Sequence, residues 1–389
     1  MEAGTISQVC FICCHPAPSA HFVDFTTQLK KAGISYDVHA ADSAYKVISE
    51  RGVQARNFSK IQTALSNLNE TELEVLTEEV VKAVSVAKCV IVDVGSTLSA
   101  QVLCVLKEKF PKVIRIGYYE NPEKFVPGGF SEAVKKVAEQ AQILLFANAN
   151  LENGPIYATA TEMIDTSGLK RIGLGYSNLE KETEILKGLR TSSDRIVKRK
   201  EFLQSHGIFD ESKKIAVYFG GANDVYYNQA FPHFLDILEK SIGSKALSEI
   251  VIVIQQHPRA KDEGNKDGLL FQKWLEKQNE VSAVLSKVSS DDVAAVADLA
   301  MYYQTSMNAK LYLSLIPILQ VGHILFSDLL VRNGLCNSVT TPESFEEKVD
   351  TLLQEKPQVD EEKVYKELGV RKDWQDVLVN LVTSTGVKE

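Results

Sequence analysis

No stretch of this 389-residue chain approaches about 20 uninterrupted apolar residues, the length that a membrane-spanning helix needs. The first residues, MEAGTISQVC, lack the basic and then apolar layout of a secretory signal. Lys and Arg (43) are outnumbered by Asp and Glu (51), and the net charge of -8 argues against a broad nucleic-acid-binding face. These absences predict a cytoplasmic protein that binds no nucleic acid. They leave a peripheral membrane contact and the oligomeric state open.

Cysteine is scarce, with six residues in the chain, and no two C-x-x-C pairs stand at the spacing of a zinc site. Cys10 and Cys13 form a lone C-x-x-C, but it lies within an expected strand, whereas a redox pair belongs at the start of a helix. A D-x-D motif near a strand end is also missing. We therefore expect buried, reduced cysteines and no metal site.

The order of apolar and polar segments is typical of an α/β protein. Continuous apolar strands alternate with amphipathic helices, as in parallel sheets that are covered by helices on both faces. In the first half we expect strands at 8–14, 35–40, 88–96, 112–119, 142–148 and within 169–179. In the second half we expect them at 214–221, 249–256, 298–303 and 316–322.

The chain is too long for one ordinary core, so we expect more than one domain. A polar, charge-rich stretch ends near Gly207 and predicts a junction between about residues 205 and 213. The expected architecture is two Rossmann-like, doubly wound parallel-sheet domains. They would span residues 1–205 and residues 213–389, and the second would end in a helical tail from Pro342 onward.

Two of the expected strands run directly into a His-Pro pair, although the chain has only seven histidines. The two segments are CFICCHPAPSA, at 10–20, and EIVIVIQQHPRAK, at 249–261. Ligands of open parallel sheets bind beyond the carboxyl ends of the strands, where helix amino termini present free N–H groups. His15 and His257 therefore mark the expected working ends of two sheets, and we expect these ends to face each other across a cleft.

Three strand ends of the second domain carry residues suited to a phosphate. Glycine lets the backbone approach an anion, His and Arg hold a phosphate, and hydroxyls at a helix start favour anions. Each motif has a structural alternative: the glycine pair as a turn, the His-Pro pair as a loop feature, and Ser306 as a helix cap. The prediction rests on all three motifs falling on strand ends of one sheet. The predicted nucleotide-binding residues are Gly220, Gly221, Asn223, His257, Arg259, Thr305, Ser306 and Asn308.

The order of these motifs has a counterpart in a known superfamily. The Gly-Gly strand end, the HPR strand end and then SSDDVAAVADLAMYYQTSMNAKLYLSLIPILQVG, with Asp298, Thr305, Ser306 and Pro317, resemble the donor domain of GT-B fold glycosyltransferases. The sequence is especially similar to bacterial sialyltransferases, polysialyltransferases and teichoic-acid polymerising transferases, in which His and hydroxyl groups hold the phosphate of a cytidine nucleotide. The first half of the chain matches by topology alone.

The resemblance implies a CMP- or UDP-linked sugar donor, a sugar or glycoconjugate acceptor, and no separate cofactor. Some GT-B transferases place their general base where His15 stands, and a histidine titrates near neutral pH. The structural alternative for His15 is a helix cap or a structural loop residue. Asp93, in VDVGST, faintly matches the acidic-glycine motif of sialyltransferases and is the weaker candidate base. Lys310 stands where many UDP-sugar transferases carry a ribose-binding Glu, so it is expected either to bind phosphate or to be solvated.

The sequence thus predicts a metal-independent glycosyltransferase that moves a sugar from a nucleotide-sugar donor to a hydroxyl acceptor. One alternative is a hydrolysing sugar-nucleotide 2-epimerase, which shares the architecture but needs further acids in the first domain. The other is a non-enzymatic two-lobed small-molecule-binding protein, a class that usually carries a signal peptide and joins its lobes by several crossovers. Fold alone does not decide among these functions.

Overall fold

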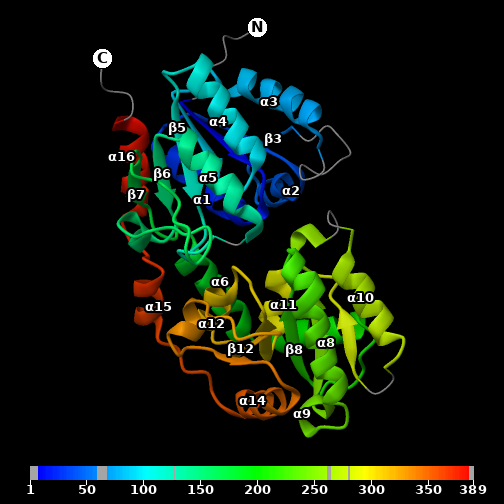
Figure 1. The fold of residues 1–389 in the computed structure, drawn as a ribbon. Coiled ribbons are helices and arrows are strands. Elements are labelled where there is room, and N and C mark those ends of the chain that lie inside the picture. The colour runs from blue at the N-terminus through cyan, green and yellow to red at the C-terminus, as the bar shows by residue number, and fades with distance from the viewer. Residues whose placement is uncertain (1–7, 59–67, 127, 261–263, 279–280, 385–389) are drawn as a thin grey trace. The chain divides into compact units, whose positions relative to one another are not determined.

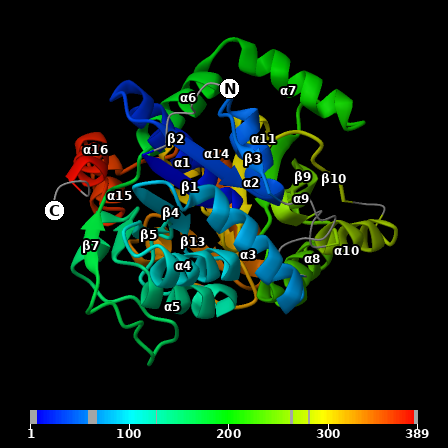
Figure 2. The ribbon, with the colours of Figure 1, turned by 90° about the horizontal axis from the view of Figure 1, so that it is seen from above.

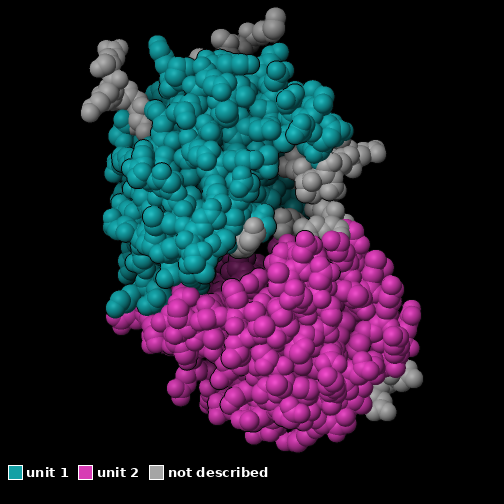
Figure 3. Space-filling model, viewed as in Figure 1, with its two compact units in different colours: residues 1–178, 365–389 teal, residues 179–364 magenta. Residues whose placement is uncertain are grey.

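The computed structural model describes residues 8–58, 68–126, 128–260, 264–278 and 281–384 (Figure 1). The chain divides into two compact units (Figure 3). Unit 1 comprises Met1–Asn178 together with Tyr365–Glu389, and unit 2 comprises Leu179–Val364. Each unit is built on its own parallel sheet, which confirms the predicted class of two parallel-sheet α/β domains.

In its described residues, unit 1 has a seven-stranded sheet of order β3-β2-β1-β4-β5-β6-β7, and all neighbours are parallel. Strands β1 and β4 are buried along their whole length and are apolar up to Asp93 at the end of β4, as expected for strands with helices on both faces. The strand order reverses between them, so the turns after β1 and β4 lie at the topological switch point. The strands are β1 (Val9–Cys13), β2 (Tyr36–Ala40), β3 (Arg56–Asn57), β4 (Cys89–Asp93), β5 (Ile114–Tyr119), β6 (Ile143–Phe146) and β7 (Lys170–Gly173).

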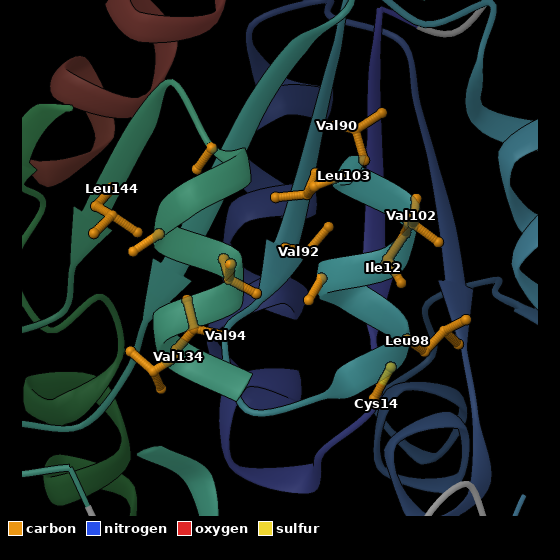
Figure 4. Close-up of a cluster of buried hydrophobic side chains, with 14 of the residues drawn as sticks. Ile12, Cys14, Val90, Val92, Val94, Leu98, Val102, Leu103, Val134 and Leu144 are labelled. Atoms are coloured by element: carbon orange, nitrogen blue, oxygen red, sulfur yellow. The ribbon is translucent and has the colours of Figure 1, made fainter. Parts of the chain in front are cut away.

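Two helical layers cover this sheet (Figure 2). On one face lie α3 (Glu70–Val84), α4 (Thr97–Lys109) and α5 (Ser131–Gln140), and their apolar side chains form one cluster with those of β1 and β4. Figure 4 shows the part of this cluster between α4, α5 and the strands. On the other face lie α1 (Pro16–Lys31), α2 (Asp42–Glu50) and α16 (Trp374–Ser384). Unit 1 also has two short 3-10 turns, Gly128–Phe130 just before α5 and Ala149–Glu152 after β6.

The carboxyl-terminal helix α16 belongs to unit 1, whereas the sequence prediction placed the whole tail in the second domain. The rings of Trp374 and Phe25 lie 6.0 Å apart, and Leu378 is completely buried in the same core. Just before α16, Nδ2 of Asn148 donates to the carbonyl oxygen of Glu367, and the N–H of Ala149 donates to that of Gly369. The tail therefore completes the core of unit 1.

Unit 2 has, in its described residues, a six-stranded parallel sheet of order β10-β9-β8-β11-β12-β13. Here the strand order reverses between β8 and β11. The strands are β8 (Lys214–Phe219), β9 (Ile250–Gln255), β10 (Ala283–Leu285), β11 (Leu299–Tyr302), β12 (Ile318–Val321) and β13 (Asn337–Val339). The end of β8 thus lies between those of β9 and β11, the order that a shared site requires.

Helices also cover both faces of this second sheet. On one face α8 (Phe231–Lys240), α9 (Lys245–Ser248), α10 (Lys266–Leu275) and α14 (Pro342–Gln354) share an apolar cluster with the strands. On the other lie α6 (Leu179–Thr191), α7 (Asp194–Ser205), α11 (Ser290–Val296) and α12 (Asn308–Leu313). A π-helical turn (Tyr226–Ala230), a 3-10 turn (Pro258–Ala260), α13 (Leu329–Arg332) and α15 (Glu361–Glu367) complete the described elements.

The boundary near residue 178 differs from the predicted junction at 205–213, because α6 and α7 are held in unit 2 by arginines. Arg190 donates to the carbonyl oxygens of Ala294 and Ala297 at the end of α11. Arg195 and Arg199 pair with Asp298, at 3.0 and 3.4 Å. These contacts join the polar segment, which the sequence prediction assigned to the end of the first domain, to the amino-terminal end of β11 in unit 2.

Sequence reasoning found the long strands and missed shorter elements. It did not anticipate α2, β10 or β13, which are short or lack a continuous apolar run. All six cysteines lie in the described part of the chain as thiols, and Cys10 and Cys13 lie within β1 as predicted. Among the helices that the structure describes, none has the length and apolar character to cross a membrane.

Candidate functional site

The turns that follow β9, β8 and β11 lie at neighbouring strand ends of unit 2, so the structure brings the three predicted motifs to one edge of one sheet. Asn223, after β8, connects two of them, because its Nδ2 donates to Oε1 of Gln304 after β11 at 3.4 Å. Its own Oδ1 accepts from the N–H of Tyr226 at 2.8 Å. Asn223 therefore stabilises the turn after β8 and also connects it to the turn after β11.

At both positions of the glycine pair after β8, the packing of Tyr226 leaves no room for a side chain. A Cβ on Gly220 would stand 2.7 Å from the hydroxyl oxygen of Tyr226, and one on Gly221 would stand 3.0 Å from the Tyr226 ring. Tyr226 is 1% exposed, so it cannot move away easily. The N–H of Gly220 donates to the carbonyl oxygen of Gln255 at 2.8 Å and is not available to an anion. The role of the glycines in phosphate binding stays a prediction.

The His-Pro corner of unit 2 follows β9 directly. His257 is half-buried, and its carbonyl oxygen accepts from the N–H of Ala260 at 2.9 Å, which closes the short 3-10 turn. The preceding Gln256 donates through Nε2 to Oδ1 of Asn265 at 2.6 Å and to Oδ1 of Asp267 at 2.8 Å. The side chain of Arg259, the charged residue predicted here, lies outside the described part of the structure.

The turn after β11 presents hydroxyls, as predicted, but its residues differ in role. Ser306 is exposed, and the amino-terminal cap of α12 is Met307, so Ser306 is not that cap. Oγ1 of Thr305 accepts from the N–H of Met307 at 3.3 Å. Nδ2 of Asn308 donates to the buried carboxylate of Asp328 at 3.1 Å, so this amide faces inward.

Lys310 is neither solvated nor directed at an anion site. It is 8% exposed, and its Nζ donates to Oδ1 of Asp291 at 2.7 Å and to Oε2 of Glu182 at 3.1 Å. These two ion pairs, in which Lys310 is buried and Asp291 is half exposed, connect α12 to α6 and α11. Both alternatives predicted for Lys310 are therefore wrong.

In unit 1, His15 caps α1 at the switch point of the sheet. It is half-buried, and its ring meets the Phe130 ring edge-on at a centroid distance of 5.4 Å. A Cβ on Gly95 would stand 2.9 Å from Cδ2 of His15, so the turn after β4 must be glycine for the imidazole to lie there. The backbone of His15 takes the cap position, but its side chain makes no capping hydrogen bond.

Asp93, the last residue of β4, lies directly behind His15 and is completely buried. Its Oδ2 accepts from the N–H groups of Cys14, at 2.5 Å, and His15, at 2.9 Å. Its Oδ1 accepts from Oγ of Ser99 at 2.9 Å. The structure thus brings the two predicted bases together, with Asp93 holding the backbone of His15. Burial and the neighbouring Asp93 raise the pKa of the Cys13 thiol, which keeps that sulfur protonated.

The structure also points to polar groups that sequence reasoning passed over. Asp267 and Tyr226 connect the turns of unit 2, but Asp267 lies in the segment GNKDG, which reads as an ordinary loop. In unit 1, Glu120 and Glu123 lie in the turn after β5, the strand next to β4. Across the residues that the structure describes, no group of three or more His, Cys, Asp or Glu side chains is arranged to hold a metal ion.

Comparison with known proteins gives no match to a family model and none to a curated sequence. Solved structures do match. UDP-GlcNAc 2-epimerase of Methanocaldococcus jannaschii, in complex with UDP-GlcNAc and UDP, has a TM-score of 0.68 at 11% identity, covering 97% of this chain and 99% of that one. The MnaA-UDP co-structure of S. aureus has a TM-score of 0.65 at 12% identity, covering 97% of this chain and 96% of that one. The Neisseria meningitidis UDP-GlcNAc 2-epimerase bound to UDP-GlcNAc has a TM-score of 0.57 at 13% identity, covering 97% of this chain and 99% of that one.

These similarities show a GT-B-like fold along nearly the whole chain and correct the predicted activity. The similar structures include UDP-GlcNAc 2-epimerases, which are isomerases, so the prediction of a glycosyltransferase is wrong in reaction and in enzyme class. They also give no support to the narrower resemblance to sialyltransferases, polysialyltransferases and teichoic-acid polymerases. The comparisons agree instead with the alternative that the sequence left open, a hydrolysing sugar-nucleotide 2-epimerase.

Proposed function

We propose that this chain binds a UDP-linked sugar and inverts the configuration at C2 of that sugar. The observation that carries the proposal is the fold similarity to UDP-GlcNAc 2-epimerases, which extends over 97% of this chain and 99% of the compared one. The position of the polar turns supports it, because nucleotides bind open α/β sheets beyond the strand ends at a topological switch point.

In this proposal the edge of unit 2 binds the diphosphate. The exposed hydroxyl of Ser306 and the hydroxyl of Thr305 donate to phosphate oxygens, and the imidazole of His257 adds a third donor. Arg259 remains the proposed charge partner. Gly220, Gly221, Asn223 and Asn308 act indirectly, by fixing the shape of the turns through Tyr226, Gln304 and Asp328.

Unit 1 supplies the proton chemistry in the same proposal. Inversion at C2 requires a proton to leave that carbon on one face while the C–H electron pair forms a C1–C2 double bond and expels UDP from C1. A second proton then adds to C2 on the opposite face, and water or UDP adds back at C1. His15 is the proposed proton-transferring residue, and Asp93 positions it through the backbone. The sequence alone showed no further acids in the first domain, but Glu120 and Glu123 at the end of β5 provide such candidates. The nucleotide sugar is the substrate, and the reaction uses no separate cofactor and no glycosyl acceptor.

The direct test combines nucleotide binding with isotope exchange at C2. UDP, CMP and GDP are compared by thermal shift, and a ligand at about 100 times its Kd stabilises the folded protein by about 2.7 kcal/mol. We expect UDP to give the largest shift and His257→Ala to abolish it. Incubation with UDP-GlcNAc in D2O should then place deuterium at C2, detected by proton NMR.

The outcomes separate the rival functions. His15→Ala should stop the exchange at C2 and leave the UDP-induced shift intact. UDP binding without any exchange would refute the epimerase and favour the non-enzymatic binding protein. If no nucleotide shifts the melting temperature at millimolar concentration, the nucleotide site itself is refuted.

A further inference from the structure

Asp267, in the first turn of α10, is completely buried, yet no predicted function depends on it. Its carboxylate accepts hydrogen bonds on both oxygens. Oδ1 accepts from Nε2 of Gln256 at 2.8 Å and from the N–H of Gly268 at 2.9 Å. Oδ2 accepts from the hydroxyl of Tyr226 at 3.3 Å. A buried carboxylate is costly unless it is bonded in this way, so its partners show what it holds.

The bond to Tyr226 connects Asp267 to the glycine turn after β8. Tyr226 fills the space in front of Gly220 and Gly221, where any Cβ would collide with it. Burial raises the pKa of Tyr226 well above its usual value, and the neighbouring Asp267 raises it further, so the phenol stays protonated and donates. Because Tyr226 is held at its hydroxyl end, the glycine turn rests against a fixed surface.

The bond to Gln256 connects the same carboxylate to the His-Pro corner after β9. Gln256 immediately precedes His257, and its Nε2 is held between Asp267 and Oδ1 of Asn265. Asn265 itself has a left-handed backbone, with φ of 54°, a conformation that asparagine tolerates better than most residues. One carboxylate thus holds the side chains behind two neighbouring turns.

We propose that Asp267 is a positioning residue of the nucleotide site, which fixes the glycine turn through Tyr226 and the His257 corner through Gln256. The inference rests on the proposed function only in assigning these turns to a nucleotide. The coupling of the two turns through Asp267 is a property of unit 2 alone. A charged acceptor suits this role because hydrogen bonds to a carboxylate are stronger than those to a neutral oxygen.

The test uses the full-length chain with Asp267→Ala, Asp267→Asn and Tyr226→Phe. The asparagine variant keeps the shape and one acceptor oxygen, and Tyr226→Phe removes one hydroxyl only, so both should fold if alanine does not. Asp298→Ala is the matched control. It too removes a carboxylate with three partners, Arg195, Arg199 and the N–H of Ile215, but it lies at the amino-terminal end of β11, the opposite edge of the sheet.

Two amides report on the turns without any ligand. The N–H of Gly220 is bonded to the carbonyl oxygen of Gln255, and that of Ala260 to the carbonyl oxygen of His257. We expect Asp267→Ala to speed hydrogen exchange at both by about tenfold or more, and Tyr226→Phe to speed it mainly at Gly220. Asp298→Ala should leave both unchanged. Wild-type exchange at both amides in Asp267→Ala would overturn the inference.

Calorimetric UDP binding is the second readout. Asp267→Ala should weaken UDP binding by about tenfold and Asp267→Asn by about threefold, while Asp298→Ala changes it by less than about twofold. Faster exchange with unchanged UDP affinity would overturn the positioning role. If the wild-type chain binds no UDP, the proposed function fails, and the exchange rates alone then decide whether Asp267 couples the two turns.

Discussion

Replacing Asp93 by alanine would remove the acceptor of two buried donors, the N–H of Cys14 and the hydroxyl of Ser99, and of one partly buried donor, the N–H of His15. An unsatisfied buried donor costs about 1–3 kcal/mol, so the free energy of unfolding of unit 1 should fall by about 4 kcal/mol. At a urea m-value of about 2 kcal/mol/M, the midpoint moves down by about 2 M. Asp93→Asn keeps an acceptor for the backbone and should cost about 1 kcal/mol.

The two tryptophans make the assay specific to one unit. Trp374 is buried in unit 1 and Trp274 in unit 2, and the chain has no other tryptophan. In a Trp274→Phe background, the fluorescence of Trp374 reports the unfolding of unit 1 by urea. In a Trp374→Phe background, Trp274 reports unit 2. Separate reporters are needed because a chain with two compact units need not unfold in one step.

The expected result is a lower midpoint for the Trp374 transition in Asp93→Ala and an unchanged midpoint for the Trp274 transition. Equal shifts of both transitions would mean that the substitution acts on the whole chain and not on the turn after β1. No shift of the Trp374 transition would refute the hydrogen bonding assigned to Asp93. A cost in Asp93→Asn as large as in Asp93→Ala would show that charge, and not the unsatisfied donors, sets the magnitude.

Three further predictions follow from burial. Leu378→Ala should lower the stability of unit 1, and not of unit 2, by about 3 kcal/mol, which the two tryptophan reporters can distinguish. Burial, aided by Arg56, lowers the pKa of His39, so below about pH 6.5 the unfolded chain binds more protons than the folded chain does. The stability of unit 1 should therefore fall as the pH drops through that value. In His39→Gln, the urea midpoint should fall less steeply with pH than in the wild type. A thiol reagent should titrate about one of the six cysteines in the native chain, the half-buried Cys104, and all six in denaturant; more than one fast native thiol would contradict the buried set.

The long strands were predictable because their apolar runs are continuous. The strands β1, β4, β8 and β9 are buried along almost their whole length, and such runs leave a local signal in sequence. The domain boundary was not predictable in this way. The polar segment that forms α6 and α7 was assigned to the first domain, because the arginines that bind it to unit 2 find their partners about 100 residues later, at the end of α11.

The residues after the strands were predictable as a set, but their roles depend on contacts that sequence spacing does not show. Asn308 and Thr305 both follow β11, yet one is bonded to Asp328, 20 residues later, and the other to a local N–H group. Lys310 reads as a phosphate ligand or a surface residue, and only the position of Glu182, 128 residues earlier, shows that it is paired. Local pattern indicates where polar groups gather, and tertiary structure decides which of them face a ligand.

Each of the two His-Pro corners is held by a buried carboxylate, and no common sequence pattern marks that carboxylate. Behind His15 stands the completely buried Asp93, 78 residues later, and beside His257 stands the completely buried Asp267, which is bonded to the residue 11 positions before it. In both cases the carboxylate accepts a hydrogen bond from the histidine at the corner or from the residue just before it. A carboxylate that accepts several hydrogen bonds in a dry interior holds its donors more firmly than water or a neutral side chain does. Under the proposed function, each histidine meets the substrate from a backbone that is already fixed, which lowers the entropy lost on binding.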